Sequence, residues 1–236
     1  MEDGQWVSLF SGGKDSVAAF VMAREAGLAV DRLVTVHPEG DSYLYHVPAT
    51  RLAELAATSI GTELTAVSGG PSSGHDSSER GDEELEPLEE ALKALDTELA
   101  GGLAGVTVGA IESEFQATRI EAMCRRLGID MYAPLWQRDP VELGEWLLDR
   151  GFEIRIVAVA AAGLGETWLG RPLDREAFSE LQALNEQYGV HVLGEGGEFE
   201  TLVTDGPHMD RPIEIEYTTH WDGTRGHVEI ESARLG

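Results

Sequence analysis

The sequence predicts an α/β fold, a domain built on a parallel sheet followed by a smaller α+β domain. Three observations support this. Short apolar runs alternate with helical patterns from residue 5 to about residue 130, which is typical of βαβ units. A glycine-rich loop stands between the first apolar run and the first helical pattern. This alternation of apolar runs and helical patterns ends near residues 133–136, so we expect domains at 1–133 and 134–236.

Each element of the first domain has its own signal. Glycines at 27, 61 and 128 follow helical patterns, as expected for residues that end helices. Leucines recur at helical spacing between residues 85 and 99. Residues 68–84 are rich in Gly, Ser, Pro and acids, so we interpret them as a surface loop. Strands are expected at 6–10, 33–36, 63–67 and 106–108, and helices at 17–26, 50–59, 85–99 and 114–127.

The second domain mixes helices with strands and turns. Helices are expected at 140–149 and 174–188, and an apolar run covers 154–162. Further strands are expected at 190–193, 199–203, 213–217 and 227–230.

The charge of the chain excludes several classes of partner. It has 43 acidic and 17 basic residues, a net charge of −26, so we expect no nucleic acid and no anionic membrane as a partner. Acid-rich, lysine-poor composition favours a protein of a salt-rich cell, because salt screens the self-repulsion; an acidic mesophile protein is the alternative. The only lysines are Lys14 and Lys93. No apolar run approaches the ~20 residues of a membrane span, and the start of the sequence lacks a leader pattern, so we expect a cytoplasmic protein.

The loop Phe10-Ser-Gly-Gly-Lys-Asp-Ser16 carries the clearest chemistry. Glycines let the backbone approach an anion closely, and the N–H groups of the following helix favour negative charge. Hydroxyls of Ser11 and Ser16 and the ammonium of Lys14 add donors. The spacing does not fit a Walker A loop or a dinucleotide fingerprint. An ordinary glycine turn is the alternative.

Ser-Gly-Gly-Lys-Asp-Ser resembles the SGGxDS loop of the PP-loop ATP pyrophosphatases. The resemblance implies a Rossmann-like nucleotide-binding domain that cleaves ATP between its α and β phosphates. ATP would then lie at the carboxyl ends of the strands. The residues implied in binding ATP are Ser11, Gly12, Gly13, Lys14, Asp15, Ser16, His37 and Gly109. Lys14 would offset charge on the pyrophosphate, and Asp15 would be an N-cap or a Mg²⁺-linked residue.

A second segment, Gly194 to Thr201, holds three carboxylates and three glycines. If Glu198 begins a strand, Glu198 and Glu200 project from one face. Like charges on one face need a cationic partner, which a metal, an ammonium ion or a cationic substrate would supply. A solvated acidic hairpin is the alternative.

This segment, Gly-Glu-Gly-Gly-Glu-Phe-Glu-Thr, resembles the diphthine–ammonia ligase family. Further similarities span nearly the whole chain: Pro38-Glu-Gly-Asp-Ser42, Tyr45-His46, Gly109-Ala-Ile111, Pro134-Leu-Trp136, Ala162-Gly-Leu164, Trp168-Leu-Gly-Arg171 and Tyr188-Gly-Val-His191. The resemblance implies a short archaeal form that uses ATP, Mg²⁺ and ammonium to amidate diphthine on translation elongation factor 2. Phe115 departs from the aromatic hydroxyl expected there, and residues 68–84 are longer and more acidic than expected.

The resemblance also implies roles. Catalysis would fall to Lys14, Asp15, Glu198 and Glu200. Substrate would be bound by Glu195, Gly196, Gly197, Glu198, Glu200, Thr201 and Trp168, with Trp168 in cation–π contact. The carboxylates would hold either the quaternary ammonium group of diphthine or the ammonium nucleophile. Another PP-loop adenylating enzyme and a non-catalytic ATP-binding module are the alternatives. The single cysteine, Cys124, disfavours tRNA thiolation.

Overall fold

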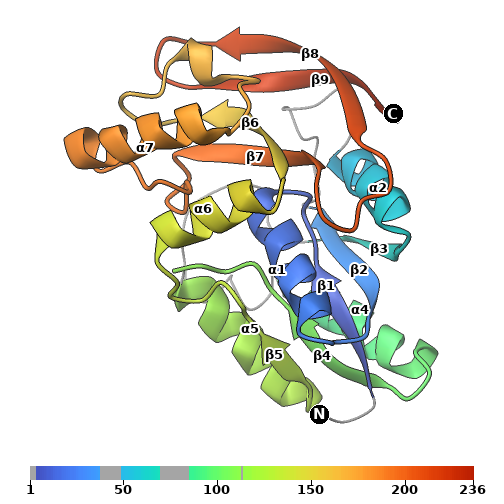
Figure 1. Ribbon diagram of the computed structural model, residues 1–236. Coiled ribbons are helices and arrows are strands. Elements are labelled where there is room, and N and C mark those ends of the chain that lie inside the picture. The colour runs from blue at the N-terminus through green and yellow to red at the C-terminus, as the bar shows by residue number, and fades with distance from the viewer. Residues whose placement is uncertain (1–3, 38–48, 70–84, 113) are drawn as a thin grey trace. The chain divides into compact units, whose positions relative to one another are not determined.

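The computed structural model describes residues 4–37, 49–69, 85–112 and 114–236 (Figure 1). The segments 38–42 and 45–46 quoted above and nearly all of the expected surface loop lie outside these residues. The chain forms two compact units. The parallel unit comprises Met1–Ser11, Asp15–Asp41 and Thr62–Trp136, and the antiparallel unit comprises Gly12–Lys14, Ser42–Gly61 and Gln137–Gly236. A single boundary between residues 133 and 134 stays a prediction.

The parallel unit holds a five-stranded sheet in the order β3-β2-β1-β4-β5. All four strand pairs are parallel, which confirms the predicted α/β architecture. The shortest strand, β5, was not expected from the sequence. The strands are β1 Gln5–Leu9, β2 Val30–His37, β3 Glu63–Ser68, β4 Leu103–Thr107 and β5 Asp130–Tyr132.

Helices α1 Lys14–Glu25, α4 Glu86–Glu98 and α5 Glu114–Leu127 follow β1, β3 and β4 in the chain. The leucine periodicity of α4 is confirmed, because Leu88, Leu92 and Leu95 are buried. These leucines share one core cluster with strand residues such as Val7 and Val106. Burying a leucine side chain stabilises the fold by roughly 1.5–3 kcal/mol, so this face accounts for the position of α4.

The antiparallel unit holds a four-stranded sheet in the order β7-β6-β9-β8, with antiparallel pairing throughout (Figure 1). Its strands are β6 Glu153–Val159, β7 Phe199–Asp205, β8 Ile213–Trp221 and β9 Gly226–Leu235. Its helices are α2 Ala49–Ile60, α6 Pro140–Asp149, α7 Arg175–Tyr188 and the short 3₁₀ helix η1 Glu166–Trp168. Helix α2 is tied to this unit by the Ser59 hydroxyl, which accepts the backbone N–H of Arg211 at 3.0 Å.

Capping residues explain where α6 and α7 begin and end. Asp139 accepts the N–H groups of Val141 and Glu142, and Asp174 accepts that of Ala177. Such caps contribute about 1 kcal/mol each. Helix α7 ends at Gly189, whose φ of 73° is left-handed. The expected strand at 190–193 is wrong: these residues form a turn.

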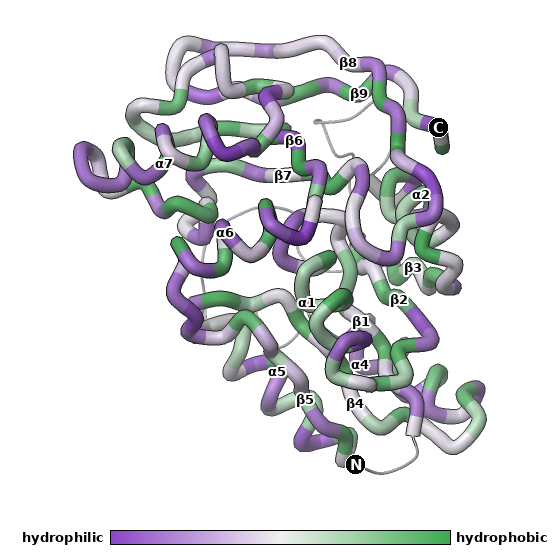
Figure 2. The backbone as a smooth tube through the Cα atoms, in the orientation of Figure 1, coloured by the Kyte–Doolittle hydropathy of each residue, from purple (hydrophilic) through white to green (hydrophobic). Residues whose placement is uncertain are grey.

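Strand β8 has a mostly exposed surface, and Figure 2 shows it white to purple along much of its length. It remains a strand because β9 pairs with it from end to end. None of the helices in the described part of the chain has the length and apolarity that a membrane crossing requires.

Candidate functional site

The loop after β1 has the geometry of an anion cradle. The backbone N–H of Ser11 donates to the Ser16 hydroxyl at 3.2 Å, and the two hydroxyl oxygens lie 3.1 Å apart. Gly12 has a φ of +82°, a conformation that L side chains rarely adopt. Helix α1 begins at Lys14, so its first N–H groups belong to the loop itself. Asp15 lies in the first turn of α1, and the interpretation of Asp15 as an N-cap is therefore wrong.

A cavity of about 290 Å³ opens beside this loop within the parallel unit. That volume is close to the lower end of the range of ~300–1,000 Å³ for ligand pockets. Its walls come from the carboxyl ends of three adjacent strands and from the start of α1, where nucleotides bind in such sheets. The lining residues are Leu9, Phe10, Ser11, Asp15, Ser16, Val34, Thr35, Val36, Val108, Gly109, Ala110 and Ile120. His37 ends β2, and nothing is described of its side chain.

Gly109 lies where a strand exit meets the first turn of α1. A Cβ added to Gly109 would stand 2.6 Å from the carbonyl carbon of Asp15 and 2.8 Å from the nitrogen of Ser16. Both neighbours are backbone atoms, so neither can swing aside. Only glycine at this position lets the backbone of the strand exit approach the anion cradle.

Replacing Gly109 with alanine is therefore expected to displace the first turn of α1. Overpacking against backbone costs roughly 1–3 kcal/mol, so the melting temperature falls and ATP affinity falls with it. Calorimetry with ATP and a thermal melt measure the two effects. Gly165→Ala is the matched control, because nothing lies within 4 Å of the Cβ it would add. If Gly109→Ala matched this control in both measurements, Gly109 would not shape the cradle.

The middle of the loop belongs to the antiparallel unit, where it is bonded to β7. The N–H of Lys14 donates to the Thr201 hydroxyl at 3.2 Å, and the N–H of Val203 donates to the Gly12 carbonyl at 3.0 Å. The Lys14 ammonium lies 5.6 Å from the centroid of the Phe199 ring, and Lys14 is only 3% exposed. Strand β7 therefore holds the backbone of the Gly12–Lys14 segment and the side chain of Lys14.

Glu198 lies just before β7 and is enclosed by its own loop. Its Oε1 accepts the N–H of His191 at 3.1 Å, and a Cβ on Gly196 would lie 2.9 Å from the same oxygen. Its Oε2 is buried, and within the described residues it has no hydrogen-bond partner. A buried carboxylate oxygen with unused lone pairs is suited to receive a small donor such as an ammonium ion.

Glu200 has a different environment. It lies within β7 between Phe199 and Thr201, the two residues that contact Lys14. Because side chains alternate along a strand, Glu200 projects from the opposite face. It is exposed and pairs with Ala158 of β6. Since Glu198 is not part of the strand, the expectation that both carboxylates belong to one strand face is wrong.

His191 organises the acidic segment, a role that the sequence analysis missed. Its Nδ1 accepts the N–H groups of Leu193 at 3.2 Å and Glu195 at 3.3 Å. The ring thus ties the backbone on both sides of Gly194 to one acceptor atom. The available signal was the position of His191, seven residues before Glu198.

Trp168 is 4% exposed, and the guanidinium of Arg171 lies 4.6 Å from the centroid of its ring. Arg171 in turn donates to both carboxylate oxygens of Glu180, at 2.8 and 2.7 Å, which lowers the pKa of Glu180. The cation–π position on Trp168 is thus filled by the protein itself. Glu195, Gly196 and Gly197 lie in the turn that leads into Glu198, and their contact with substrate stays a prediction.

Cys124 is buried in α5, and burial raises the pKa of its thiol to about 11. The thiolate is the reactive form, so we expect iodoacetamide to leave the native protein unlabelled at pH 8 and to label it once it is unfolded. Because the unfolded thiol ionises first, stability falls as the pH rises from about 9 towards 11. Mass spectrometry measures the labelling, and a native protein labelled as fast as the unfolded one would contradict the burial.

Within the described residues, no group of three or more His, Cys, Asp or Glu side chains is placed to hold a metal ion. Mg²⁺ bound through substrate phosphates needs only one or two carboxylates, and Asp15 lines the cavity beside the cradle. The residues present therefore fit a Mg²⁺ ion that is carried in with a nucleotide.

Comparison with known proteins gives matches along nearly the whole chain. Residues 4–131 match the family model of the diphthamide synthase N-terminal domain, and residues 139–235 match that of the diphthamide synthase C-terminal domain. A diphthine–ammonia ligase of Danio rerio is 35% identical over 223 residues, which cover 90% of this chain and 86% of that protein. The diphthine–ammonia ligase of Homo sapiens is 32% identical over 222 residues, which cover 89% of this chain and 82% of that protein.

Among solved structures, a predicted subunit of tRNA methyltransferase from Methanocaldococcus jannaschii superposes with a TM-score of 0.42. It is 19% identical and covers 86% of this chain and 97% of its own. A likeness of this size says nothing about what the chain binds.

Proposed function

The chain belongs to the diphthamide synthase family, and on that premise we propose that it is an ATP-dependent ligase that converts diphthine to diphthamide with ammonia. One observation carries the proposal: both family domains match, and within the first of them the SGGKDS loop forms an anion cradle beside a cavity. A carboxylate does not react with ammonia unless it is activated. ATP supplies the activation by transferring AMP to the carboxylate and releasing pyrophosphate.

The residues of the cradle suit the phosphates of ATP. The Ser16 hydroxyl supplies a hydrogen-bond donor at the start of α1, and the helix dipole there favours the negative charge. The N–H of Lys14 takes no part, because it donates to the Thr201 hydroxyl. Lys14 stabilises the charge that develops on the pyrophosphate. The adenine and ribose would lie beside Val36 and Gly109 in the cavity, and Asp15 would hold a Mg²⁺ ion that arrives with the nucleotide.

The acidic segment serves the second half of the reaction. Glu198 accepts hydrogen bonds from an ammonium ion at its buried Oε2 and takes one of its protons, which leaves ammonia to attack the activated carboxyl. The amide forms as the bond to AMP breaks, and the second proton of the nitrogen passes to solvent. His191 holds Glu198 in place through its N–H. An anionic group at this position suits a cation and disfavours a triphosphate, which supports a role apart from ATP binding.

We propose translation elongation factor 2 as the protein substrate, a cytoplasmic location and an archaeal, salt-adapted source. The net charge of −26 and the presence of only two lysines support the last point. The many exposed ion pairs, such as Arg125 with Glu121 at 3.0 Å, add little stability, since exposed pairs contribute ~0–1 kcal/mol.

Salt is therefore expected to stabilise the protein. The range of charge repulsion falls from about 10 Å at 0.1 M to about 3 Å at 1 M salt. Salt therefore weakens the mutual repulsion of the 43 acidic side chains, which only 17 basic side chains offset. Thermal melts from 0.1 to 3 M KCl should show a midpoint that rises with salt. A melting midpoint that stays constant or decreases as the salt concentration rises would refute salt adaptation. It would not bear on the proposed reaction.

The experiment that tests the function incubates the protein with ATP, ammonium and elongation factor 2 bearing diphthine. We expect the factor to gain an amide by mass spectrometry, and AMP and pyrophosphate to form in equal amounts by chromatography. ADP as the main product would refute PP-loop chemistry. Pyrophosphate without amide would point to another adenylating enzyme, and ATP binding without turnover would point to a binding module.

A further inference from the structure

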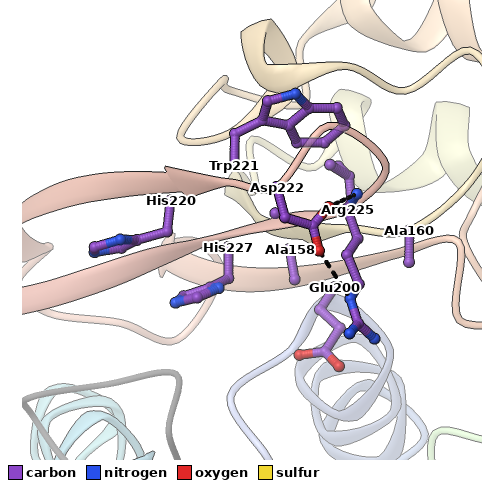
Figure 3. Close-up of a pocket in the computed structure, with 10 residues that line it drawn as sticks. Ala158, Ala160, Glu200, His220, Trp221, Asp222, Arg225 and His227 are labelled. Carbon is purple, nitrogen blue, oxygen red and sulfur yellow. Dashed lines mark hydrogen bonds and ion pairs between the residues drawn. The ribbon is translucent and has the colours of Figure 1, made fainter.

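A second cavity, of about 600 Å³, lies within the antiparallel unit and lacks a role in the scheme above (Figure 3). Its lining comes from β6, from Glu200 of β7 and from the turn between β8 and β9. The lining residues are Ala158, Val159, Ala160, Glu200, His220, Trp221, Asp222, Arg225, Gly226 and His227. Glu198 is not among them, which separates the two carboxylates of the acidic segment.

Four of these residues form one row across the sheet. Glu200 pairs with Ala158, Ala158 pairs with His227, and His227 pairs with His220. Directly paired residues of neighbouring strands project from the same face of a sheet. In Figure 3 the side chains of His220, His227 and Glu200 accordingly extend to one side of the strands. Along the row, the imidazoles of His220 and His227 are followed by the methyl group of Ala158 and the carboxylate of Glu200.

The two imidazoles of the row are already stacked. The ring centroids of His220 and His227 lie 5.1 Å apart with an interplanar angle of 19°. His220 is held by Glu229, whose carboxylate lies 2.6 Å from its Nε2. Strands in a sheet are spaced by about 4.8 Å, which is also a favourable separation for stacked rings. The next place in the stack falls over Ala158, whose side chain is too small to fill it.

The far side of this slot is closed by Glu200. No hydrogen bond or ion pair from Glu200 to another described residue is found. The other charges of the cavity compensate each other, because Arg225 Nε donates to Asp222 Oδ2 at 3.2 Å. Hydrogen bonds from the N–H groups of Arg225 and Thr224 lower the pKa of Asp222 and stiffen the turn. The cavity therefore presents one uncompensated carboxylate to a planar slot.

A planar ring with an N–H group fits this slot in shape and in charge. One face would stack on His227, the Ala158 methyl would lie beneath it, and a ring N–H would reach the Glu200 carboxylate. We propose that this slot binds the imidazole ring of the substrate's modified histidine. The inference rests on the proposed function and deepens it, since it assigns Glu200 to the histidine ring and leaves Glu198 to the ammonium ion.

Filling the slot tests the inference directly. Ala158→Leu places a larger side chain where the ring would lie and changes no charge. We expect the KM for elongation factor 2 bearing diphthine to rise at least tenfold, while the KM for ATP stays within twofold of wild type. Ala162→Leu is the matched control, because Ala162 is exposed and lies outside the cavity. An unchanged KM for the factor in a folded Ala158→Leu variant would overturn the inference.

A second pair of variants keeps the test independent of how Ala158→Leu folds. His227→Ala removes the stacking partner and should raise the KM for the factor by about 2- to 12-fold, the range of aromatic pair energies. His227→Phe restores a flat ring and should recover most of that loss. A rise in the KM for ATP instead would assign the slot to adenine and refute the inference. Wild-type protein that forms no amide would refute the proposed function itself, whatever these variants do.

Discussion

Replacing Lys14 with methionine is expected to slow pyrophosphate release by roughly 100- to 1,000-fold, the effect of removing one preorganised charge from a developing anion. Methionine keeps the apolar length of the lysine stem, which is buried beside Phe199, and removes only the charge. ATP affinity should fall less than turnover, because the backbone N–H groups of the cradle remain. Single-turnover kinetics and calorimetry with ATP separate the two.

The sequence supplies its own control for this experiment. Lys93 is the only other lysine of the chain, and its exposed ammonium pairs at 2.9 Å with Glu89 of α4, a half-buried carboxylate that Arg126 also holds. Lys93→Met makes the same chemical change on the surface, where such a pair contributes only about 0.3–0.5 kcal/mol. Turnover in Lys93→Met should equal wild type. A Lys14→Met variant within tenfold of this control would show that Lys14 is not part of the chemistry.

Replacing Glu198 with glutamine is expected to lower amide formation at least tenfold, which corresponds to about 1.4 kcal/mol. Glutamine retains an oxygen that accepts the N–H of His191, so the loop keeps its shape while the negative charge at Oε2 is lost. The KM for ammonium should rise and the KM for ATP should stay constant. Mass spectrometry of the elongation factor measures the amide over a series of ammonium concentrations.

Glu186→Gln makes the same change on an exposed residue of α7 and should leave both KM values unchanged. Full activity of Glu198→Gln at every ammonium concentration would remove Glu198 from the site. A rise in the KM for ATP instead would assign the carboxylate to the nucleotide, as a metal ligand. A purely structural role would lower the melting temperature and leave the KM for ammonium as it was.

Much of the fold could be predicted because the elements carry periodic patterns. The leucines of α4 recur every three or four residues and are buried as expected. Helices α6 and α7 lie within one residue of the ranges 140–149 and 174–188 that were expected. Strand β5 escaped prediction because its three residues are half-buried or exposed and show no alternation. The apolar residues within 190–193 fit the pattern of a strand. They form a turn because the Leu193 N–H donates to the His191 ring and the Asn185 side chain donates to the Val190 carbonyl.

The candidate site could be predicted only in part, for a physical reason. The cradle is local, so its glycines, hydroxyls and helix start are adjacent in the sequence. The bonds from β7 to Gly12 and Lys14 join segments about 190 residues apart, and no local pattern encodes them. The row from Glu200 to His220 is equally hidden, because it depends on the register of four strands. Glu198 and Glu200 therefore look equivalent in the sequence, although Glu198 is enclosed by its own loop and Glu200 lines the cavity.

The bonds from β7 to the loop also have a consequence for synthesis of the chain. The N–H of Lys14 and the hydroxyl that receives it are separated by 187 residues. A ribosome that adds ~5–20 residues per second makes that hydroxyl roughly 10–40 s after the loop itself. Until then water must satisfy the loop groups that β7 later bonds. The Gly12–Lys14 segment thus reaches its final form among the last parts of the nascent protein, and a chain that terminates before β7 carries the complete SGGKDS motif without the strand that bonds to this segment.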